Sequence, residues 1–235
     1  MIKTFIAGHN GMVGSAIIRE LTNTNNNRKI ITETRENLDL TNQLKVNSFI
    51  KKINPDEIII AAAKVGGIHA NSTYPAEFIY DNLTIASNLI HAAYTNNVKK
   101  LLYLGSSCIY PRESSQPIIE ESLLTGPLES TNEWYAISKI AGIKLCQAYR
   151  KQYNCNFISA MPTNLYGIQD NYHLQNAHVI PAIMHRAWIA KNNKRDELII
   201  WGSGNPTREF LFVDDLAKGC LFLLDNYSED IPINI

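Results

Sequence analysis

The hydrophobic positions of this chain alternate between short apolar runs and longer stretches with helical spacing. The apolar runs predict β-strands at residues 3–7, 29–34, 57–63, 100–106, 157–161 and 198–201. The 3.6-residue spacing predicts helices at residues 13–21, 76–96, 133–153 and 214–224. Strands that alternate with helices form right-handed β-α-β units. We therefore expect an α/β fold, a Rossmann-like doubly wound sheet with six or seven parallel strands.

Composition and charge narrow the class of partner. Of the 235 residues, 45% are hydrophobic and 19% are charged, which is an ordinary globular balance. The formal net charge is zero and no block of like charges occurs, which argues against nucleic acid or a membrane surface as the main partner. No apolar stretch approaches the ~20 residues of a membrane span. Residues 1–8 run from a strand into a glycine turn, unlike a signal peptide, so we expect a cytoplasmic protein.

The four cysteines give no sign of a metal site. They are Cys108, Cys146, Cys155 and Cys220, and no two of them are spaced as Cys-x-x-Cys. Neither a zinc site nor a redox motif is therefore expected. Free thiols in a reducing compartment are the expected state.

A glycine-rich turn links the first predicted strand to the first predicted helix. Gly8, Gly11 and Gly14 have the spacing Gly-x-x-Gly-x-x-Gly. The first glycine permits a tight turn, the second lets backbone N–H groups approach a pyrophosphate, and the third lets helix and strand pack closely. The helix N-terminus itself favours anions. A turn without a ligand is the weaker interpretation in this context, and a dinucleotide cofactor is predicted.

The end of the second predicted strand bears on which dinucleotide binds. An NAD enzyme usually has an acidic residue here that bonds the ribose 2′-hydroxyl. This strand ends Glu33-Thr34-Arg35, and Arg35 can pair with a 2′-phosphate, which favours NADP. Glu33 as a ribose ligand, with Arg35 a solvated surface charge, remains the alternative. Asp39 and Leu40 suit a contact with the adenine.

A serine, a tyrosine and a lysine supply candidate catalytic chemistry. Tyr135 and Lys139 are four residues apart in a predicted helix and therefore share a face. We expect the ammonium of Lys139 to lower the pKa of the Tyr135 phenol and to bind the nicotinamide ribose. Tyr135 then exchanges a proton with a carbonyl or alcohol oxygen. Ser106 ends a predicted strand, where open α/β sheets hold ligands, and can hydrogen-bond the same oxygen.

These features resemble the extended short-chain dehydrogenase/reductases, and longer stretches resemble the GDP-L-fucose synthase family among them. The matching stretches are residues 61–68, 104–111, 161–167, 178–181 and 201–204, and the resemblance covers essentially the whole chain. Ser-Ser-Cys at 106–108 and His-Val-Ile-Pro at 178–181 are the most specific parts. The resemblance implies that GDP-4-keto-6-deoxy-D-mannose is epimerised at C3 and C5 and then reduced at C4 with NADPH.

The resemblance also implies roles for a cysteine and a histidine. Cys108 and His178 match the acid/base pair that inverts C3 and C5. The protons on these carbons lie α to the ketone, so a weak base removes them when Tyr135 and Ser106 stabilise the enolate oxygen. Without the resemblance, Cys108 reads as a small buried hydrophobe and His178 as a cap of the following helix.

The remaining site residues are also those implied by the resemblance. The positions that match cofactor contacts are Gly8, Asn10, Gly11, Met12, Val13, Gly14, Arg35, Asp39, Leu40, Leu104, Gly105, Lys139, Pro162, Asn164, Leu165 and His178. The positions that match GDP-sugar contacts are Asn164, Arg186, Trp201 and Arg208. The guanidinium fork of arginine bonds two diphosphate oxygens at once. Trp201 in core packing is the alternative. The family commonly has a basic residue where Asn10 stands, which weakens the case for NADP.

The expected organisation follows from the same comparison. Residues 1–162 are expected to form the NADP-binding Rossmann domain, and residues 163–235 the last sheet strands with part of a substrate-binding lobe. Residues 231–235 read as a strand that is just starting, and the family continues for roughly 80 to 90 residues more, the size of a small lobe. We expect that lobe to be truncated here. The long helices at 76–96 and 133–153 are expected to form a homodimer interface.

Three other functions stay open at this point. A sugar-nucleotide 4,6-dehydratase needs an Asp-Glu pair beside the serine, where this chain has Ser107-Cys108. A 4-epimerase keeps its cofactor tightly bound and needs no Cys/His pair. A non-catalytic dinucleotide-binding protein is consistent with a truncated lobe, but not with an intact set of Ser106, Tyr135 and Lys139.

Overall fold

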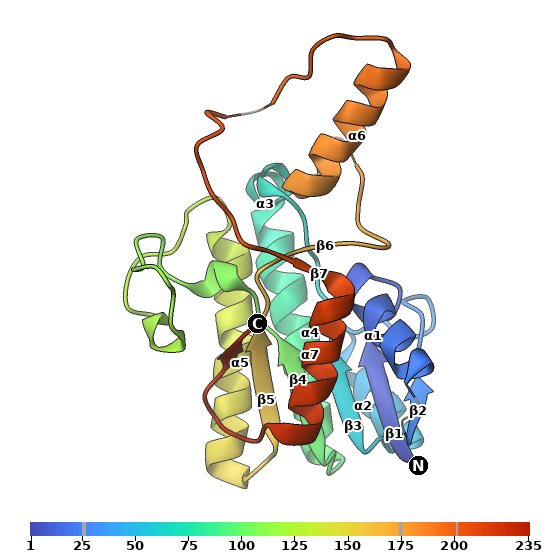
Figure 1. The fold of residues 1–235 in the computed structure, drawn as a ribbon. Helices are drawn as coiled ribbons and strands as arrows, with labels where there is room; N and C mark the ends of the chain where they lie inside the picture. The colour runs from blue at the N-terminus through green and yellow to red at the C-terminus, as the bar shows by residue number, and fades with distance from the viewer. Residues whose placement is uncertain (25–26, 174–175, 201) are drawn as a thin grey trace.

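The computed structural model describes residues 1–24, 27–173, 176–200 and 202–235. A parallel sheet of six strands in the order β2-β1-β3-β4-β5-β8 forms the centre of this part of the chain (Figure 1). The strands are β1 (Ile2–Ala7), β2 (Arg28–Ile31), β3 (Glu57–Ile60), β4 (Lys100–Leu104), β5 (Phe157–Met161) and β8 (Ile233–Asn234). The predicted Rossmann-like parallel sheet is confirmed.

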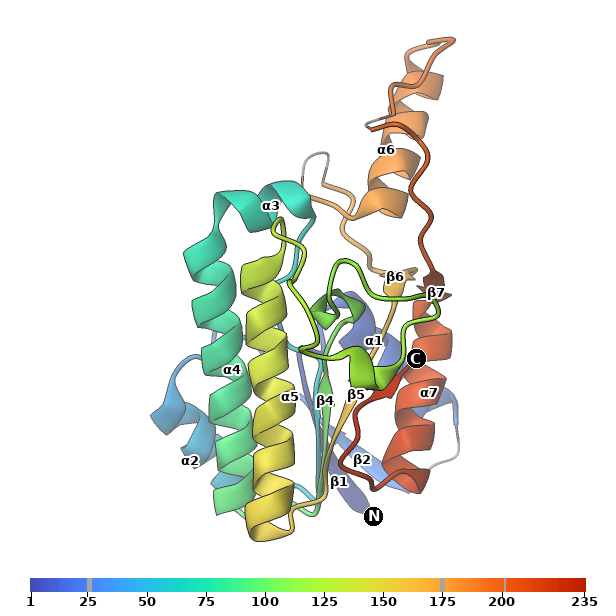
Figure 2. The ribbon, with the colours of Figure 1, turned by 90° about the vertical axis from the view of Figure 1, so that its left-hand side faces the viewer.

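Helices cover both faces of this sheet, as Figures 1 and 2 show. One face packs against α2 (Gln43–Ile53), α4 (Pro75–Thr95) and α5 (Glu133–Tyr153), and the other against α1 (Met12–Asn23) and α7 (Val213–Asn226). Strand β3 contributes to both hydrophobic clusters: Ile58 and Ile60 face α4, and Ile59 faces α7. Its apolar sequence therefore reflects burial on both faces, as predicted.

Beyond β5 the chain leaves the sheet and returns to it. Two short parallel strands, β6 (Asn164–Tyr166) and β7 (Phe210–Phe212), form a separate pair. Between these two strands in the sequence, α6 (Val179–Asn192) projects away from the body of the protein. Helix α3 (Ile68–Thr73), which follows β3 in the sequence, lies near the start of α6 (Figure 1). None of the helices in the described part of the chain is long and apolar enough to cross a bilayer.

One predicted strand is wrong. Residues 198–200 belong to no strand, and residue 201 lies outside the described residues. Ile199 and Ile200 are 78% and 57% exposed. An apolar run becomes a strand only where a neighbour pairs with its backbone, and this segment follows the projecting helix α6, away from the sheet.

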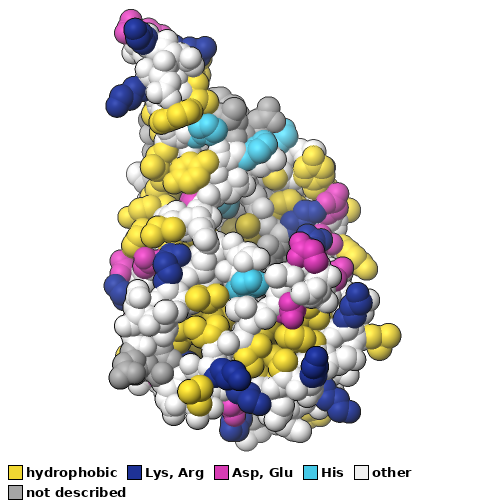
Figure 3. Space-filling model, turned by 90° about the vertical axis from the view of Figure 1, so that its right-hand side faces the viewer, with side chains coloured by type: hydrophobic (Ala, Val, Ile, Leu, Met, Phe, Trp, Pro, Cys, Tyr) yellow, Lys and Arg dark blue, Asp and Glu magenta, His cyan; other side chains and the backbone are white. Residues whose placement is uncertain are grey.

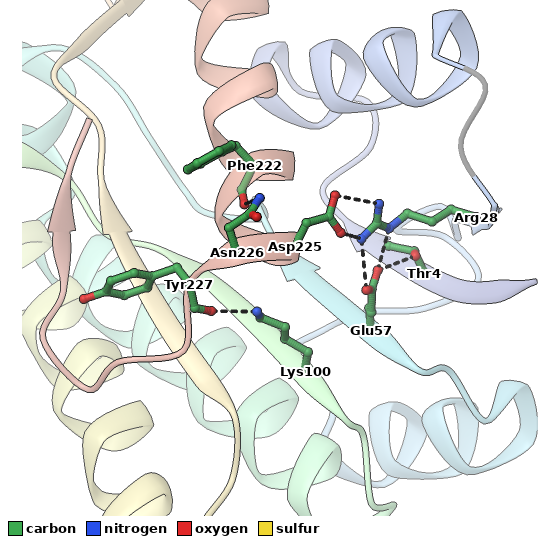
Figure 4. Close-up of polar contacts among 8 residues, drawn as sticks. All are labelled: Thr4, Arg28, Glu57, Lys100, Phe222, Asp225, Asn226 and Tyr227. Carbon is green, nitrogen blue, oxygen red and sulfur yellow. Dashed lines mark hydrogen bonds and ion pairs between the residues drawn. The ribbon is translucent and has the colours of Figure 1, made fainter.

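Helix α7 is tied to the amino-terminal edge of the sheet by a polar network (Figure 4). Arg28 binds the carboxylates of Glu57 and Asp225 at once, and Thr4 donates to Glu57 over 2.9 Å. The two carboxylates raise the pKa of the Arg28 guanidinium. Lys100 donates to the carbonyl of Tyr227, just after α7, over 2.6 Å. The opposite, carboxyl-terminal edge is the one at which open parallel sheets bind ligands.

Candidate active site

The turn between β1 and α1 is too crowded for side chains. Gly8 has φ of +89°, and a Cβ there would lie 2.6 Å from the nitrogen of Ala62. A Cβ at Gly14 would lie 2.2 Å from the carbonyl oxygen of Gly8. Gly11 is the N-cap of α1, and its N–H bonds the Gly8 carbonyl over 3.0 Å. Gly8 and Gly14 are therefore needed for the turn, as the sequence predicted, whereas a Cβ at Gly11 would lie 3.4 Å from the Gly8 carbonyl oxygen, an ordinary contact.

This turn fits a dinucleotide pyrophosphate. No side chain among the described residues caps α1, and its first turn carries no acidic residue. Its N–H groups and dipole are therefore left to an anion. The expected cofactor contacts Asn10, Met12 and Val13 lie on this turn and the start of the helix.

The segment after β2 brings charged residues to the same edge. Glu33 accepts hydrogen bonds from Asn37 and from the Thr34 N–H, each 3.0 Å, and these bonds lower its pKa. The charge of His9 adds to this effect, so Glu33 lies close to the glycine turn. Arg35 is exposed. The carboxylate of Glu33 is thus already bonded within its own loop, whereas Arg35 faces solvent.

The expected adenine contacts lie in the next turn of this segment. Asp39 accepts from the Thr41 N–H over 2.9 Å, and the carbonyl of Leu40 accepts from Asn88 over 2.9 Å. Both residues are half-buried. The loop is therefore held by a hydrogen bond of its own and by one from α4.

Ser106 and Cys108 lie together just beyond β4. Ser106 caps a short 3-10 turn, and its Oγ lies 3.2 Å from the Cys108 Sγ and 3.4 Å from the Cys108 nitrogen. Gly105 and Leu104 precede them at the end of the strand. Burial raises the pKa of the Cys108 thiol, while the Ser106 hydrogen bond and the Lys139 charge lower it. Cys108 is thus a protonated thiol at neutral pH with a cation nearby.

Tyr135 lies against the same group, but its acidity differs from the expected one. A hydrogen bond joins it to Ser106, and the ring of Phe78 packs edge-on with centroids 6.4 Å apart. Desolvation by the surrounding protein raises the pKa of the half-buried phenol. The hydrogen bond with Ser106 lowers this pKa, but by less. The predicted lowering by Lys139 is therefore wrong for this structure, because desolvation is the larger effect.

Lys139 is buried and held by backbone. Its Nζ donates to the Leu104 carbonyl over 2.7 Å and lies 5.0 Å from the centre of the Tyr103 ring and 5.7 Å from that of Tyr135. Burial lowers the pKa of Lys139 to about 8. The ammonium thus points at the tyrosine ring face and the strand end. Tyr103 and Phe78 were missed by sequence reasoning because they read only as core residues of a strand and a helix.

His178 comes from a different part of the chain. It is the N-cap of α6. Desolvation lowers the pKa of its imidazole, and the negative charge of Asp170 opposes this shift. Among the described residues, Ser106, Lys139 and Tyr135 are polar neighbours of Cys108, and no hydrogen bond is found between Cys108 and His178. The structure brings Ser106, Cys108, Tyr135 and Lys139 together, and it places His178 at the base of the projecting helix.

The expected sugar-nucleotide residues lie along the segment after β5. Pro162 is buried, and Leu165 lies in β6. Asn164 donates to the carbonyl of Glu209 over 3.0 Å, so it lies next to the strand that follows Arg208.

Of the two expected phosphate ligands, Arg208 is exposed and Arg186 is half-buried. Arg208 donates to the Thr207 carbonyl over 2.7 Å, and Arg186 lies on α6. Trp201 lies outside the described residues. Figure 3 shows hydrophobic side chains along the projecting arm that contains α6, where Met184 and Trp188 are exposed. Within the described ranges, no cluster of three or more His, Cys, Asp or Glu side chains is arranged to hold a metal ion.

The sequence is similar to those of known proteins. A family model described as the NAD dependent epimerase/dehydratase family matches residues 4–235. GDP-L-fucose synthase 1 of Arabidopsis thaliana is 58% identical over 233 residues, covering 99% of this chain and 72% of the relative. GDP-L-fucose synthase of Escherichia coli is 52% identical over 223 residues, covering 95% of this chain and 69% of the relative.

A solved structure agrees. A GDP-L-fucose synthetase from Naegleria fowleri bound to NADP superimposes with a TM-score of 0.92 at 30% identity, covering 100% of this chain and 76% of that one. This chain belongs to the NAD dependent epimerase/dehydratase family and, within it, to the GDP-L-fucose synthases.

Proposed function

We propose that this chain is an NADPH-dependent enzyme that epimerises C3 and C5 of GDP-4-keto-6-deoxy-D-mannose and reduces C4, giving GDP-L-fucose. One observation carries the proposal: Ser106, Cys108, Tyr135 and Lys139 form one cluster at the carboxyl end of β4. A hydrogen-bonding hydroxyl, a thiol and a proton-donating phenol are the groups that the two reactions need. Relatives named for this activity support the choice of substrate.

The epimerisation uses the thiol and the histidine. Cys108 first loses its thiol proton to solvent, and the thiolate then removes the proton from the carbon next to the ketone. Ser106 and Tyr135 donate hydrogen bonds to the enolate oxygen that forms. His178 returns a proton to the opposite face of the carbon, which inverts the centre. The same exchange at the second carbon completes the epimerisation, and the cysteine and histidine regain their starting protonation through solvent.

The reduction uses the tyrosine and the lysine. When bound, NADPH supplies the hydride for C4. Tyr135 gives its phenolic proton to the C4 oxygen, and its raised pKa ensures that the proton is present at neutral pH. Lys139 places its ammonium beside the Tyr135 ring, where it stabilises the phenolate left behind.

The remaining contacts follow from position. We assign the pyrophosphate of NADP to the turn formed by Gly8, Gly11 and Gly14, and the diphosphate of the sugar nucleotide to Arg186 and Arg208. Asn164 and Trp201 complete the sugar-nucleotide contacts, and Leu104, Gly105, Pro162 and Leu165 line the nicotinamide end. On this assignment residues 1–162 are the cofactor domain, and residues 163–235 carry substrate contacts.

Arg35 determines the preference for NADPH in this account. Replacing it with alanine removes a charge-assisted phosphate contact worth ~1.5–3 kcal/mol, so NADPH should bind about tenfold or more weakly. NADH affinity should change little, because NADH lacks the 2′-phosphate. Fluorescence titration of both cofactors measures this, and Arg35→Lys is the control that keeps the charge. Equal affinity of the unmodified chain for the two cofactors would refute the assignment.

We propose that the chain is a homodimer built on α4 and α5. Tyr80 and Trp134 on these helices are 66% and 44% exposed, and tyrosine and tryptophan are favoured at protein interfaces. Light scattering should give twice the 26.5 kDa chain mass. Tyr80→Glu should shift the equilibrium towards monomer, while Tyr172→Glu, outside these helices, should not. A monomer at micromolar concentration of the unmodified chain would contradict the proposal.

One assay separates this function from its competitors. The unmodified chain is mixed with NADPH and GDP-4-keto-6-deoxy-D-mannose, and NADPH absorbance is followed. A reductase consumes one NADPH per sugar, whereas a 4-epimerase or a dehydratase consumes none and a binding protein leaves the sugar unchanged.

The four free cysteines support our placing the enzyme in the cytoplasm.

A further inference from the structure

We propose that Asn71 and Asn82 position His178 for the epimerisation by holding the β3–α3 loop, residues 61–67, against the start of α6. Neither asparagine is placed among the reacting groups, and each acts through the loop. This inference rests on the proposed function, because it assigns the two asparagines to the epimerisation rather than to the reduction.

Asn82 fixes the middle of the β3–α3 loop. It is 3% exposed on α4, its Oδ1 accepts from the Lys64 N–H over 2.8 Å, and its Nδ2 donates to the Lys64 carbonyl over 3.0 Å. Two bonds to the backbone of one residue fix both its position and its direction. Nδ2 also donates to the carbonyl of Phe78, whose ring packs on Tyr135. One turn of α4 therefore contacts Tyr135 and fixes the loop.

Asn71 fixes the end of the same loop. It is 6% exposed, and its Nδ2 donates to the carbonyls of Gly66 and Gly67 over 2.8 and 3.2 Å. The Gly67 N–H in turn donates to the carbonyl of Asn176 over 2.9 Å. A Cβ at Gly67 would lie 2.7 Å from the Ala177 carbonyl oxygen. The loop thus contacts the two residues that immediately precede His178.

This contact matters because α6 projects from the body beyond it (Figures 1 and 2). His178 is the N-cap of that helix, so the backbone at Asn176 and Ala177 determines where its imidazole lies. Proton transfer to carbon requires hydrogen-bond reach, and a misplacement of about 1 Å can cost roughly 100-fold in rate. The series of contacts from Asn82 through the loop to Ala177 therefore sets the geometry of proton transfer in the epimerisation.

The test uses two substitutions, one that adds bulk to the loop and one that adds a negative charge. Gly67→Ala forces a methyl group against the Ala177 carbonyl, and Asn71→Asp replaces the amide donor by a carboxylate that faces two carbonyls. In both variants, kcat for solvent deuterium incorporation at C3 and C5 should fall about 10- to 100-fold. The KM for the sugar and the Kd for NADPH should stay within about twofold. Gly219→Ala on α7 is the control, because its Cβ meets only the Ile235 side chain at 3.5 Å.

Amide hydrogen exchange gives a readout that needs no turnover. In Gly67→Ala the amides of residues 176–182 should exchange faster, while those of α5 keep their protection. Deuterium incorporation at the unmodified rate in both variants, or unchanged protection at 176–182, would overturn the inference. An unmodified chain that neither oxidises NADPH nor exchanges the sugar would sink the proposed function instead, and the amide protection would still decide whether the loop holds α6.

Discussion

Tyr135→Phe should lower the rate of ketone reduction by about 10²- to 10⁴-fold, the range typical of losing a positioned general acid. The ring stays, so packing against Phe78 survives, but the proton for the C4 oxygen is gone. NADPH binding should be nearly unchanged. Single-turnover measurement of NADPH oxidation with saturating sugar gives the rate of the reduction alone.

The matched control is Tyr110→Phe, which removes a phenol bonded to Asn234 rather than to Ser106. Its rate of reduction should stay within a few-fold of the unmodified rate, as expected of a group outside the reacting cluster. Reduction by Tyr135→Phe at more than about a tenth of the unmodified rate would remove the tyrosine from its role as acid.

Cys108→Ser should nearly abolish deuterium incorporation at C3 and C5, with a loss of about 100-fold or more. Thiols ionise near 8.5 and alcohols far higher, so the hydroxyl keeps the shape of the group but is a much weaker acid. NADPH binding should survive. Because hydride transfer depends on Tyr135 and Lys139, direct reduction of the unepimerised ketone should appear. Mass spectrometry of the sugar after incubation in heavy water measures the exchange.

Cys146→Ser is the matched control, because Cys146 is a buried thiol on α5, about two turns after Lys139, and belongs to the hydrophobic core rather than to the reacting cluster. Exchange by Cys108→Ser at the unmodified rate would return the cysteine to the role of a packed thiol. His178 or a water molecule would then have to act as the base.

The sheet and its long helices were predictable because their signals are local. The run at β3 is apolar because both of its faces are buried, and α5 shows helical spacing from Glu133 to Tyr153. The short strands β6 and β7 could not be found in this way. Each has three residues, and each depends on a partner more than forty positions away in the chain, which no local pattern records.

In the site, too, local features could be predicted from the sequence and features that depend on distant contacts could not. The spacing of Tyr135 and Lys139 predicted their common face, but it carried no information about desolvation, which raises the pKa of the phenol. Ser106 was singled out by its place at a strand end, whereas the role expected of Cys108, which lies beside it, came only from the family resemblance. Phe78 and Asn82 were missed because their roles depend on contacts between α4 and distant segments.

The most direct test of the account is the isotope pattern that the unmodified chain leaves in the sugar. GDP-4-keto-6-deoxy-D-mannose is incubated with the chain in heavy water, first without and then with NADPH, and the sugar is analysed by mass spectrometry and NMR. The account predicts deuterium at both C3 and C5 without NADPH, and GDP-L-fucose labelled at the same carbons with it. A reduced sugar without deuterium at C3 and C5 would contradict the claim that one site performs both reactions.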